Sequence, residues 1–388
     1  MKRLCKDIDI TDISLISRAV YKCLERKYKR NDTIKYFSQV SGVSEDALRN
    51  ILEDYGKEAL YPVVDKICDI LRDEIISGNI SFPKIWYREK IDGSSGKVRR
   101  IGIQNVKQQL YDYIAVEGLN PILKRIGEYQ CASIKGRGTL SGKKSIARWM
   151  KNKNNRYFAK LDVQKCFESI DREKLLAFLQ HHIKNDRLIN LIRILIGSFE
   201  RGLSIGSYLS QYLCNLYMSI LYHYIMEDLY RVRRGREGNA RVRLVNKCLI
   251  YMDDILIIGS RRRDLEKSIC LIIKKADELG LVIKTNYQIR SIDGNAIDMM
   301  GYKIYRTHTE IRGRIFLRIR RAYRKARSGI SPRIAKKCLS YYGYLKHTDS
   351  RRIERKWKVK RIIRKCKEVI RNESKIYKPA ASSQRCCA

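Results

Sequence analysis

One stretch, CLIYMDDILIIG from Cys248 to Gly259, places two consecutive aspartates between two apolar runs. Short apolar runs bounded by turn residues are typical of buried strands, and these two predict a β-hairpin with Asp253 and Asp254 at its bend. Aspartate tolerates turn conformations, so the pair alone is compatible with an ordinary turn. Two adjacent carboxylates next to buried strands, however, require a compensating positive charge.

A third aspartate, Asp162, lies in another apolar segment, AKLDVQKCF. Carboxylates brought together on one sheet repel each other and bind protons unless a divalent cation compensates their charge. Mg²⁺ suits such a site because it prefers oxygen ligands and is usually held by carboxylates together with substrate phosphates. Two such ions about 4 Å apart support in-line phosphoryl transfer. The three aspartates therefore indicate a metal-dependent phosphoryl-transfer site.

The chain is strongly basic, since 82 Lys and Arg against 41 Asp and Glu give a formal net charge of +41 over 388 residues. A charge this large opposes compaction, so a polyanionic partner is expected, and nucleic acid is the first candidate. Hydrophobic residues make up 44% of the chain, which excludes a disordered polycation. A membrane surface is the second candidate, but no basic amphipathic helix with a clean apolar face is visible.

The first residues lack the apolar core of a signal peptide, and no uncharged run reaches membrane-spanning length. We therefore expect a cytoplasmic protein without a membrane partner. The 12 cysteines include no Cys-x-x-Cys pair, which argues against zinc fingers and disulfide frameworks. Buried reduced thiols are expected, with Cys386 and Cys387 in a frayed tail.

Hydrophobic periodicity predicts helices over most of residues 1–80 and at 106–126 and 145–152, with two basic strands around a turn at Gly93–Gly96. Residues 132–142 are expected to form a glycine-punctuated loop. The middle of the chain alternates strands and helices, including one long helix over residues 207–232, and the segment after residue 306 is basic and helical. This order predicts the α+β class, with an antiparallel sheet backed by helices.

Taken in order, the segments between residues 85 and 305 resemble a reverse transcriptase. YMDD, Tyr251 to Asp254, resembles that family's metal-binding turn, and LDVQKCF resembles the strand with the other metal aspartate. The resemblance implies that Asp162 ligates two Mg²⁺ ions, for which Mn²⁺ can substitute. It also implies that the Val163 carbonyl contributes to one of them, that Asp253 is the main third ligand, and that Asp254 is a lesser one.

The resemblance also implies residues that bind the nucleotide and the primer. Phe167 falls at the position of the steric gate that excludes ribonucleotides, and Arg99 in VRRIGI at that of the arginine on the incoming triphosphate. Lys284, in ADELGLVIKTNYQI, falls where a lysine protonates the leaving pyrophosphate. IDMMGYKIY resembles the primer-grip hairpin, with Gly301 and Tyr302 at its bend.

The segment IGSYLSQ, Ile205 to Gln211, indicates a subtype. Related enzymes usually carry Gln-Gly-x-x-x-Ser-Pro here; Gly206 keeps the glycine, Ile205 replaces the glutamine and Gln211 the proline. This pattern, together with YQCASIKGRG and SYYGYLKHTDS, resembles the reverse transcriptases of diversity-generating retroelements. These copy a template-repeat RNA with frequent errors opposite adenines, and the cDNA replaces a variable repeat. An apolar Ile205 cannot make the usual polar discrimination contact, so reduced fidelity is expected.

The fold implied by the resemblance is a right hand. It consists of an N-terminal helical segment at 1–80, fingers at 81–155, a palm at 156–305 with part of the fingers at about 172–203, a basic helical thumb at 306–375, and a flexible tail at 376–388. The implied partners are template RNA, cDNA primer and product, dNTPs and a small helical-bundle accessory protein, in a bacterial or phage-encoded system.

Three alternatives stay open at this point. The first is a retron or group II-like reverse transcriptase, against which IGSYLSQ speaks. The second is a defence-type polymerase that adds nucleotides without a template. The third is a non-catalytic RNA-binding scaffold, against which the intact Asp162, Asp253 and Asp254 speak.

Overall fold

The computed structural model describes residues 3–91, 96, 98–235 and 238–376. The chain divides into two compact units, one made of residues 1–138 and 159–289 and the other of residues 139–158 and 290–388. The turn predicted at Gly93–Gly96 lies outside the described residues except for Gly96. Cys386, Cys387 and the rest of the predicted tail beyond residue 376 lie outside them as well.

The first unit begins with helices, as predicted. They are α1 (Ile13–Leu24), α2 (Asn31–Ser41), α3 (Glu45–Asp54), the 3₁₀ helix η1 (Lys57–Leu60) and α4 (Tyr61–Ser77). Side chains cap the first and third of these helices, because Asp12 accepts a hydrogen bond from the Ser14 N–H and Ser44 from the Ala47 N–H. The apolar face of α1 packs on α4 and on α5 (Val106–Gly118).

The two predicted basic strands form an antiparallel hairpin, β1 (Trp86–Ile91) with β2 (Val98–Ile103). Most of its residues are exposed, so the hairpin presents both faces to solvent over much of its length. Helix α5, the short α6 (Asn120–Leu123) and the two-residue strand β3 (Gln130–Cys131) follow it.

A five-stranded sheet has the order β3-β7-β8-β4-β9. Its strands besides β3 are β4 (Tyr157–Asp162), β7 (Lys247–Tyr251), β8 (Asp254–Gly259) and β9 (Ile289–Ser291). Strands β7 and β8 form the predicted antiparallel hairpin, with Tyr251 opposite Asp254. Ile255 to Ile258 are fully buried, which explains why the strand is apolar at consecutive positions instead of alternating.

Helices cover this sheet and extend the unit. They are α8 (Cys166–Ser169), α9 (Arg172–His182), α10 (Asp186–Gly197), α11 (Tyr208–His223) and α12 (Arg262–Glu278). Helix α11 packs on β7 and α12 packs on β8, so the sheet is backed by helices as the α+β class requires.

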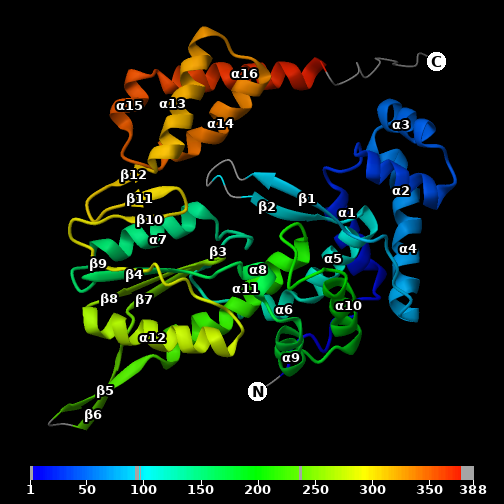
Figure 1. The fold of residues 1–388 in the computed structure, drawn as a ribbon. Coiled ribbons are helices and arrows are strands. Elements are labelled where there is room, and N and C mark those ends of the chain that lie inside the picture. Colours follow the sequence, from blue (N-terminus) through cyan, green and yellow to red (C-terminus); the bar gives the residue numbers. More distant parts are fainter. Residues whose placement is uncertain (1–2, 92–95, 97, 236–237, 377–388) are drawn as a thin grey trace. The chain divides into compact units, whose positions relative to one another are not determined.

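The prediction of one helix over residues 207–232 is wrong at its C-terminal end. Helix α11 ends at His223, a π-helical turn η2 (Tyr224–Asp228) follows, and the chain then forms a two-stranded ribbon of β5 (Tyr230–Gly235) and β6 (Gly238–Arg243). The tyrosines and leucines that continue the helical period are also compatible with a strand. The hydrogen-bonded pairing of β5 with β6 favours the strand over the helix. In Figure 1 the ribbon extends away from α12.

The second unit combines small strands with helices. It contains α7 (Thr139–Lys151), the strands β10 (Ile297–Met299), β11 (Tyr302–Ile304) and β12 (Thr309–Ile311), and helices α13 (Gly313–Ser328), α14 (Pro332–Lys346), α15 (Arg351–Lys356) and α16 (Val359–Ile376). Helix α7 begins at Thr139, so the loop predicted at 132–142 is shorter than expected.

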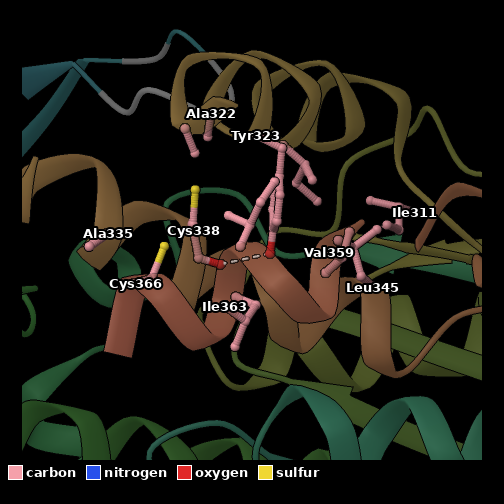
Figure 2. Close-up of a cluster of buried hydrophobic side chains, with 12 residues drawn as sticks. Ile311, Ala322, Tyr323, Ala335, Cys338, Leu345, Val359, Ile363 and Cys366 are labelled. Atoms are coloured by element: carbon pink, nitrogen blue, oxygen red, sulfur yellow. Dashed lines mark hydrogen bonds between the residues drawn. The ribbon is translucent and has the colours of Figure 1, made fainter. Parts of the chain in front are cut away.

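The helices after residue 306 enclose a core of their own, as Figure 2 shows. Tyr323 is buried at its centre and donates a hydrogen bond of 3.1 Å from its hydroxyl to the Cys338 carbonyl. The predicted basic helical segment is therefore a packed bundle instead of an extended charged arm. Across the described residues, no helix combines the length and the apolarity needed to span a membrane.

Candidate active site

A tight turn places the two adjacent aspartates. Tyr251 and Asp254 face each other across β7 and β8, and Met252 and Asp253 connect them. Met252 has a φ of +56°, a left-handed conformation that costs a non-glycine residue about 1–2 kcal/mol. The strained turn holds Asp253 at the tip of the hairpin. Its side chain is exposed there, and neighbouring charged residues act on its carboxyl.

Asp162 lies at the end of β4, which neighbours β8 in the sheet. Directly after it, the Val163 N–H donates a hydrogen bond of 2.9 Å to the Asp253 carbonyl. The Lys284 N–H donates one of 2.9 Å to the Asp162 carbonyl. Three segments far apart in the sequence are therefore tied together by backbone hydrogen bonds at one edge of the sheet.

Two of the three carboxylates have lysine partners. The Asp162 carboxylate forms an ion pair with Lys284, and Asp254 forms one of 2.9 Å with Lys160. Asp253 is different, because burial raises the pKa of its carboxyl and the neighbouring Asp254 raises it further. Its own backbone hydrogen bond lowers that pKa, Asp162 raises it, and Arg99 lowers it again. Asp254, Asp162 and Arg99 are thus the charged side chains that act on the Asp253 carboxyl.

The donor set fits a hard divalent cation, because carboxylate and carbonyl oxygens are the ligands that Mg²⁺ prefers. Among residues 3–91, 96, 98–235 and 238–376, no three His, Cys, Asp or Glu side chains are arranged closely enough to form a metal cluster. At the same edge, Lys160 and Lys284 form ion pairs with Asp254 and Asp162. The ammonium groups of these two lysines therefore place positive charge beside the carboxylates at this edge of the sheet.

Phe167, the predicted gate residue, is half-buried in α8, directly after the buried Cys166. Its carbonyl accepts a hydrogen bond of 2.7 Å from the Leu203 N–H. Gly202, with a φ of +45°, lies so close that a Cβ atom there would be 2.4 Å from the Phe167 carbonyl oxygen. The loop before α11 therefore holds the Phe167 backbone in place.

Ile205 and Gly206 lie where that loop meets the β1–β2 hairpin. Ile205 lines a cavity of about 280 Å³ together with residues of the hairpin and of α8. At Gly206, a Cβ atom would lie 1.9 Å from the Gly102 carbonyl oxygen of β2, so only glycine fits. Gln211, one turn into α11, accepts a hydrogen bond of 2.7 Å from the Ser133 hydroxyl. Close packing against β2 therefore explains the glycine at position 206. The hydrogen bond of Gln211 joins α11 to the segment around Ser133, which is distant in the sequence.

Arg99 and Arg100 are neighbours on β2 and point to opposite faces of the strand. Arg100 donates two hydrogen bonds, of 2.6 and 3.0 Å, to the Glu200 carboxylate and stacks on Tyr87 with its guanidinium 4.2 Å from the ring centre. Arg100 is therefore a structural residue. The charge of Arg99, by contrast, acts on Asp253, which supports Arg99 as the candidate of the two.

Sequence reasoning missed Asp112, a fully buried carboxylate on α5. It accepts hydrogen bonds of 2.7 Å from the Ser207 hydroxyl and 3.3 Å from the Leu209 N–H. Burial raises the pKa of Asp112 to about 6, although those hydrogen bonds oppose the shift. Ser207 itself caps α11 by accepting from the Ser210 N–H, so Asp112 holds the start of the helix that follows Ile205. The one available signal was a lone aspartate on the apolar face of VKQQLYDYI.

Gly301 and Tyr302 belong to the second unit and are described there alone. Gly301, with a φ of +87°, follows Met300 at the bend between β10 and β11, as predicted. A Cβ atom on Gly301 would lie 2.8 Å from Ile315 and 2.9 Å from Tyr344, so the bend packs tightly on α13 and α14. The ring of Tyr302 lies 5.2 Å from that of Tyr344.

Comparison with known proteins found a family match and similar solved structures. The family model described as reverse transcriptase (RNA-dependent DNA polymerase) matches residues 89–303. Among solved structures, apo telomerase from Candida tropicalis is similar at 13% identity with a TM-score of 0.42, covering 77% of this chain and 66% of the telomerase chain. No curated protein matches the chain.

The matched region contains the β1–β2 hairpin from residue 89, the five-stranded sheet and the three aspartates. The expected α+β fold is confirmed by the sheet and the helices that back it, and the expected family is the one whose model matches. Since the match covers more than half of its 388 residues, this chain belongs to the reverse transcriptase family of RNA-dependent DNA polymerases.

Proposed function

We propose that this chain copies an RNA template into DNA by transferring nucleotides at the edge formed by Asp162, Asp253 and Asp254. The observation that supports this best is the tie between the segments, in which Val163 donates to the Asp253 carbonyl and Lys284 to the Asp162 carbonyl. Ordinary turn aspartates need no second strand and no lysine partners. A reactive centre needs both, because its groups must be held in fixed positions.

In the proposed site, Asp162, Asp253, Asp254 and the Val163 carbonyl hold two Mg²⁺ ions. The ions would supply a Lewis acid at the transferred phosphate and a lowered pKa at the primer 3′-hydroxyl. Asp253 is the main protein ligand beside Asp162, because desolvation and the neighbouring Asp254 carboxylate raise the pKa of its carboxyl, and a bound cation would offset both effects. Asp254 is the lesser ligand by the family resemblance; Lys160 would compete with a cation for Asp254, as Lys284 would for Asp162.

Protein side chains orient the nucleotide around this centre. Arg99 binds the triphosphate, since its charge already acts at the carboxylate edge. Lys284 holds a proton on its Nζ atom beside Asp162 and donates it to the leaving pyrophosphate. Phe167 excludes the ribose 2′-hydroxyl, because the loop at Gly202 keeps its backbone from retreating. Gly301 and Tyr302 grip the primer. In the proposed right-hand arrangement, residues 81–155 act as the fingers, residues 156–305 as the palm and residues 306–375 as the thumb.

A finer proposal is the diversity-generating subtype, with a template-repeat RNA, adenine-directed errors and a small helical-bundle accessory protein. Ile205 supports it, because this apolar residue lines the cavity beside the β1–β2 hairpin where a polar side chain is usual in the family. Gln211 supports it too, because its bond to Ser133 joins the two segments whose residues suggested the subtype. A retron or group II-like enzyme is the nearest alternative, and a defence-type polymerase the next.

Primer extension tests the reaction. Purified chain with Mg²⁺, a primed RNA template and dNTPs should produce cDNA, and Asp253→Asn should reduce extension by about a thousandfold or more. Asp277→Asn, at an exposed position on α12, serves as a matched control that keeps wild-type activity. Equal extension by the Asp253 variant would refute the site. Extension that continues without template would favour the defence-type alternative.

The subtype has its own test. Ile205→Gln restores a polar group at the nucleotide and should lower misincorporation opposite template adenine by about tenfold, corresponding to about 1–3 kcal/mol of discrimination. Ile205→Leu preserves the apolar volume and should leave the error rate unchanged. An error spectrum that is identical in Ile205→Gln and wild type would remove the fidelity argument.

A further inference from the structure

The ribbon of β5 and β6 is a strongly charged surface that the catalytic site does not use. Its twelve described residues include five arginines and no carboxylate: Arg231, Arg233, Arg234, Arg241 and Arg243. All but one of these arginine side chains are exposed. Such a density of one charge in a folded element opposes its own stability, which indicates an anionic partner.

The ribbon is a built element with an anchored base. Its strands pair without interruption from Tyr230 opposite Arg243 to Gly235 opposite Gly238. At the base, the buried Leu244 donates a backbone hydrogen bond of 3.0 Å to the carbonyl of the buried Leu229. A flexible loop would need neither this register nor this anchor.

The two faces of the ribbon differ. Residues paired across the strands point to the same face, so Arg231 shares one face with Val242 and is held 3.5 Å from Asp264 of α12. The opposite face carries Tyr230, Val232, Arg234, Asn239, Arg241 and Arg243. One face is therefore attached to the first unit, and the other presents three arginines outward.

The outward face suits nucleic acid in detail. Arg241 and Arg243 lie two residues apart on β6, about 6.6 Å along the strand, so both side chains point the same way. The central carbon of the Arg241 guanidinium lies 4.3 Å from the centre of the Tyr230 ring, a cation–π contact that holds this arginine on the outward face. Val232 and Tyr230 remain 55% and 36% exposed, so ribose and base surfaces also find apolar contacts.

The ribbon lies at the other end of β7 from the carboxylates. Strand β7 runs from Lys247, near the base of the ribbon, to Tyr251, next to the metal-binding turn, a length of about 15 Å. RNA that touches the ribbon is thus separate from the residues that carry out nucleotide transfer.

We propose that the outward face of the β5–β6 ribbon is a second RNA-binding surface, which holds the sugar–phosphate backbone of the template RNA away from the site of synthesis. This proposal rests on the proposed function, since a polymerase that copies RNA must retain that RNA between nucleotide additions. An acidic protein is the competing partner for the same charges, but stacked tyrosine and exposed arginine on one face favour RNA.

Fluorescence anisotropy with a labelled 40-nucleotide single-stranded RNA tests the proposal. The variant Arg234→Ala/Arg241→Ala/Arg243→Ala should weaken binding about tenfold or more and make the slope of log K against log salt shallower by about 2, from three lost phosphate contacts. The control variant Arg26→Ala/Lys29→Ala/Lys35→Ala removes the same charge from exposed positions around α1 and α2. It should bind RNA like wild type.

Two results would overturn the proposal. One is unchanged RNA affinity in the ribbon variant, which would leave an acidic protein as the partner of this face. The other is an equal loss in the control variant, which would mean that only net charge matters. Extension of a short primed homopolymer should stay at wild-type level in the ribbon variant. If the wild-type chain binds RNA but never extends a primer, the proposed function is refuted. The anisotropy measurements still test whether the ribbon binds RNA.

Discussion

The Nζ atom of Lys160 lies 2.9 Å from the Asp254 carboxylate, on the strand that also carries Asp162. Lys160 and Asp162 are two residues apart on β4, so both side chains point to the same face of the sheet. The pair explains why two adjacent aspartates need not be equivalent, since Asp254 is neutralised by the protein and Asp253 is not. It also makes a prediction about metal requirement.

Lys160→Gln should lower the Mg²⁺ concentration needed for half-maximal primer extension by up to about fivefold. The reason is that the lysine competes with a cation for Asp254, and the pair is partly exposed and worth about 1 kcal/mol or less. Mg²⁺ titrations of initial extension rate measure the effect. Lys267→Gln, at an exposed position on α12, is the matched control. A higher Mg²⁺ requirement in the Lys160 variant would contradict the competition.

Asp112 predicts a specific dependence of stability on pH. Its pKa is about 6 in the folded chain, above the ordinary 3.8, so the protonated form is favoured by folding. The stability that this group contributes is fully present below about pH 4 and is lost as pH rises through about 6, by up to about 3 kcal/mol.

Asp112→Asn should remove that component, because the amide has no proton to lose. Urea unfolding of both proteins between pH 4 and pH 7 gives the free energy of unfolding, and the difference between wild type and variant should change with pH in this window. Asn can still accept from the Ser207 hydroxyl, so the variant should fold. Parallel pH curves for the two proteins would show that Asp112 titrates normally.

Glu200→Gln should loosen the hold on the β1–β2 hairpin without unfolding the chain. Both side chains of the Arg100–Glu200 pair are about half exposed, so the stability change should stay within about 1 kcal/mol. Because the neighbouring Arg99 is the proposed triphosphate residue, KM for dNTP should rise several-fold while kcat changes little. Steady-state extension kinetics measure both, with the exposed Glu53→Gln on α3 as control. A fall in kcat alone would mean that the pair serves another step.

The sequence predicted the elements whose period is unambiguous. The apolar runs at Cys248–Gly259 indicate buried strands, and the three- and four-residue spacing before residue 80 and after residue 306 indicates helices, although the short strand β12 precedes those of the second segment. The β5–β6 ribbon was not predicted because its tyrosine and valine are compatible with the helical repeat and with the two-residue repeat of a strand. The pairing that decides between them comes from the second strand.

For the candidate site, the sequence suggests residue types but not their pairings. Asp162, Asp253 and Asp254 stand out by their apolar surroundings, whereas Lys160 resembles any of the many lysines of this chain and Lys284 is singled out only by the family resemblance. Which lysine reaches which aspartate depends on strand order and on the backbone tie at Val163. Asp112 was hidden for the same reason, because its partners Ser207 and Leu209 lie about a hundred residues away.

Gly206→Ala tests whether the backbone contact between the loop and β2 is needed. A Cβ atom at this position would lie 1.9 Å from the Gly102 carbonyl oxygen, and neither backbone segment can yield easily. Overpacking of this kind costs about 1–3 kcal/mol, and the displaced hairpin should reduce extension at least about tenfold by moving Arg99 from the carboxylate edge. Gly138→Ala is the matched control, because a Cβ atom there meets nothing within 4 Å. Thermal unfolding and primer extension should leave the control at wild-type values and lower both for Gly206→Ala. Wild-type extension by Gly206→Ala would mean that the hairpin adjusts freely, and that its distance from Ile205 does not matter for the reaction.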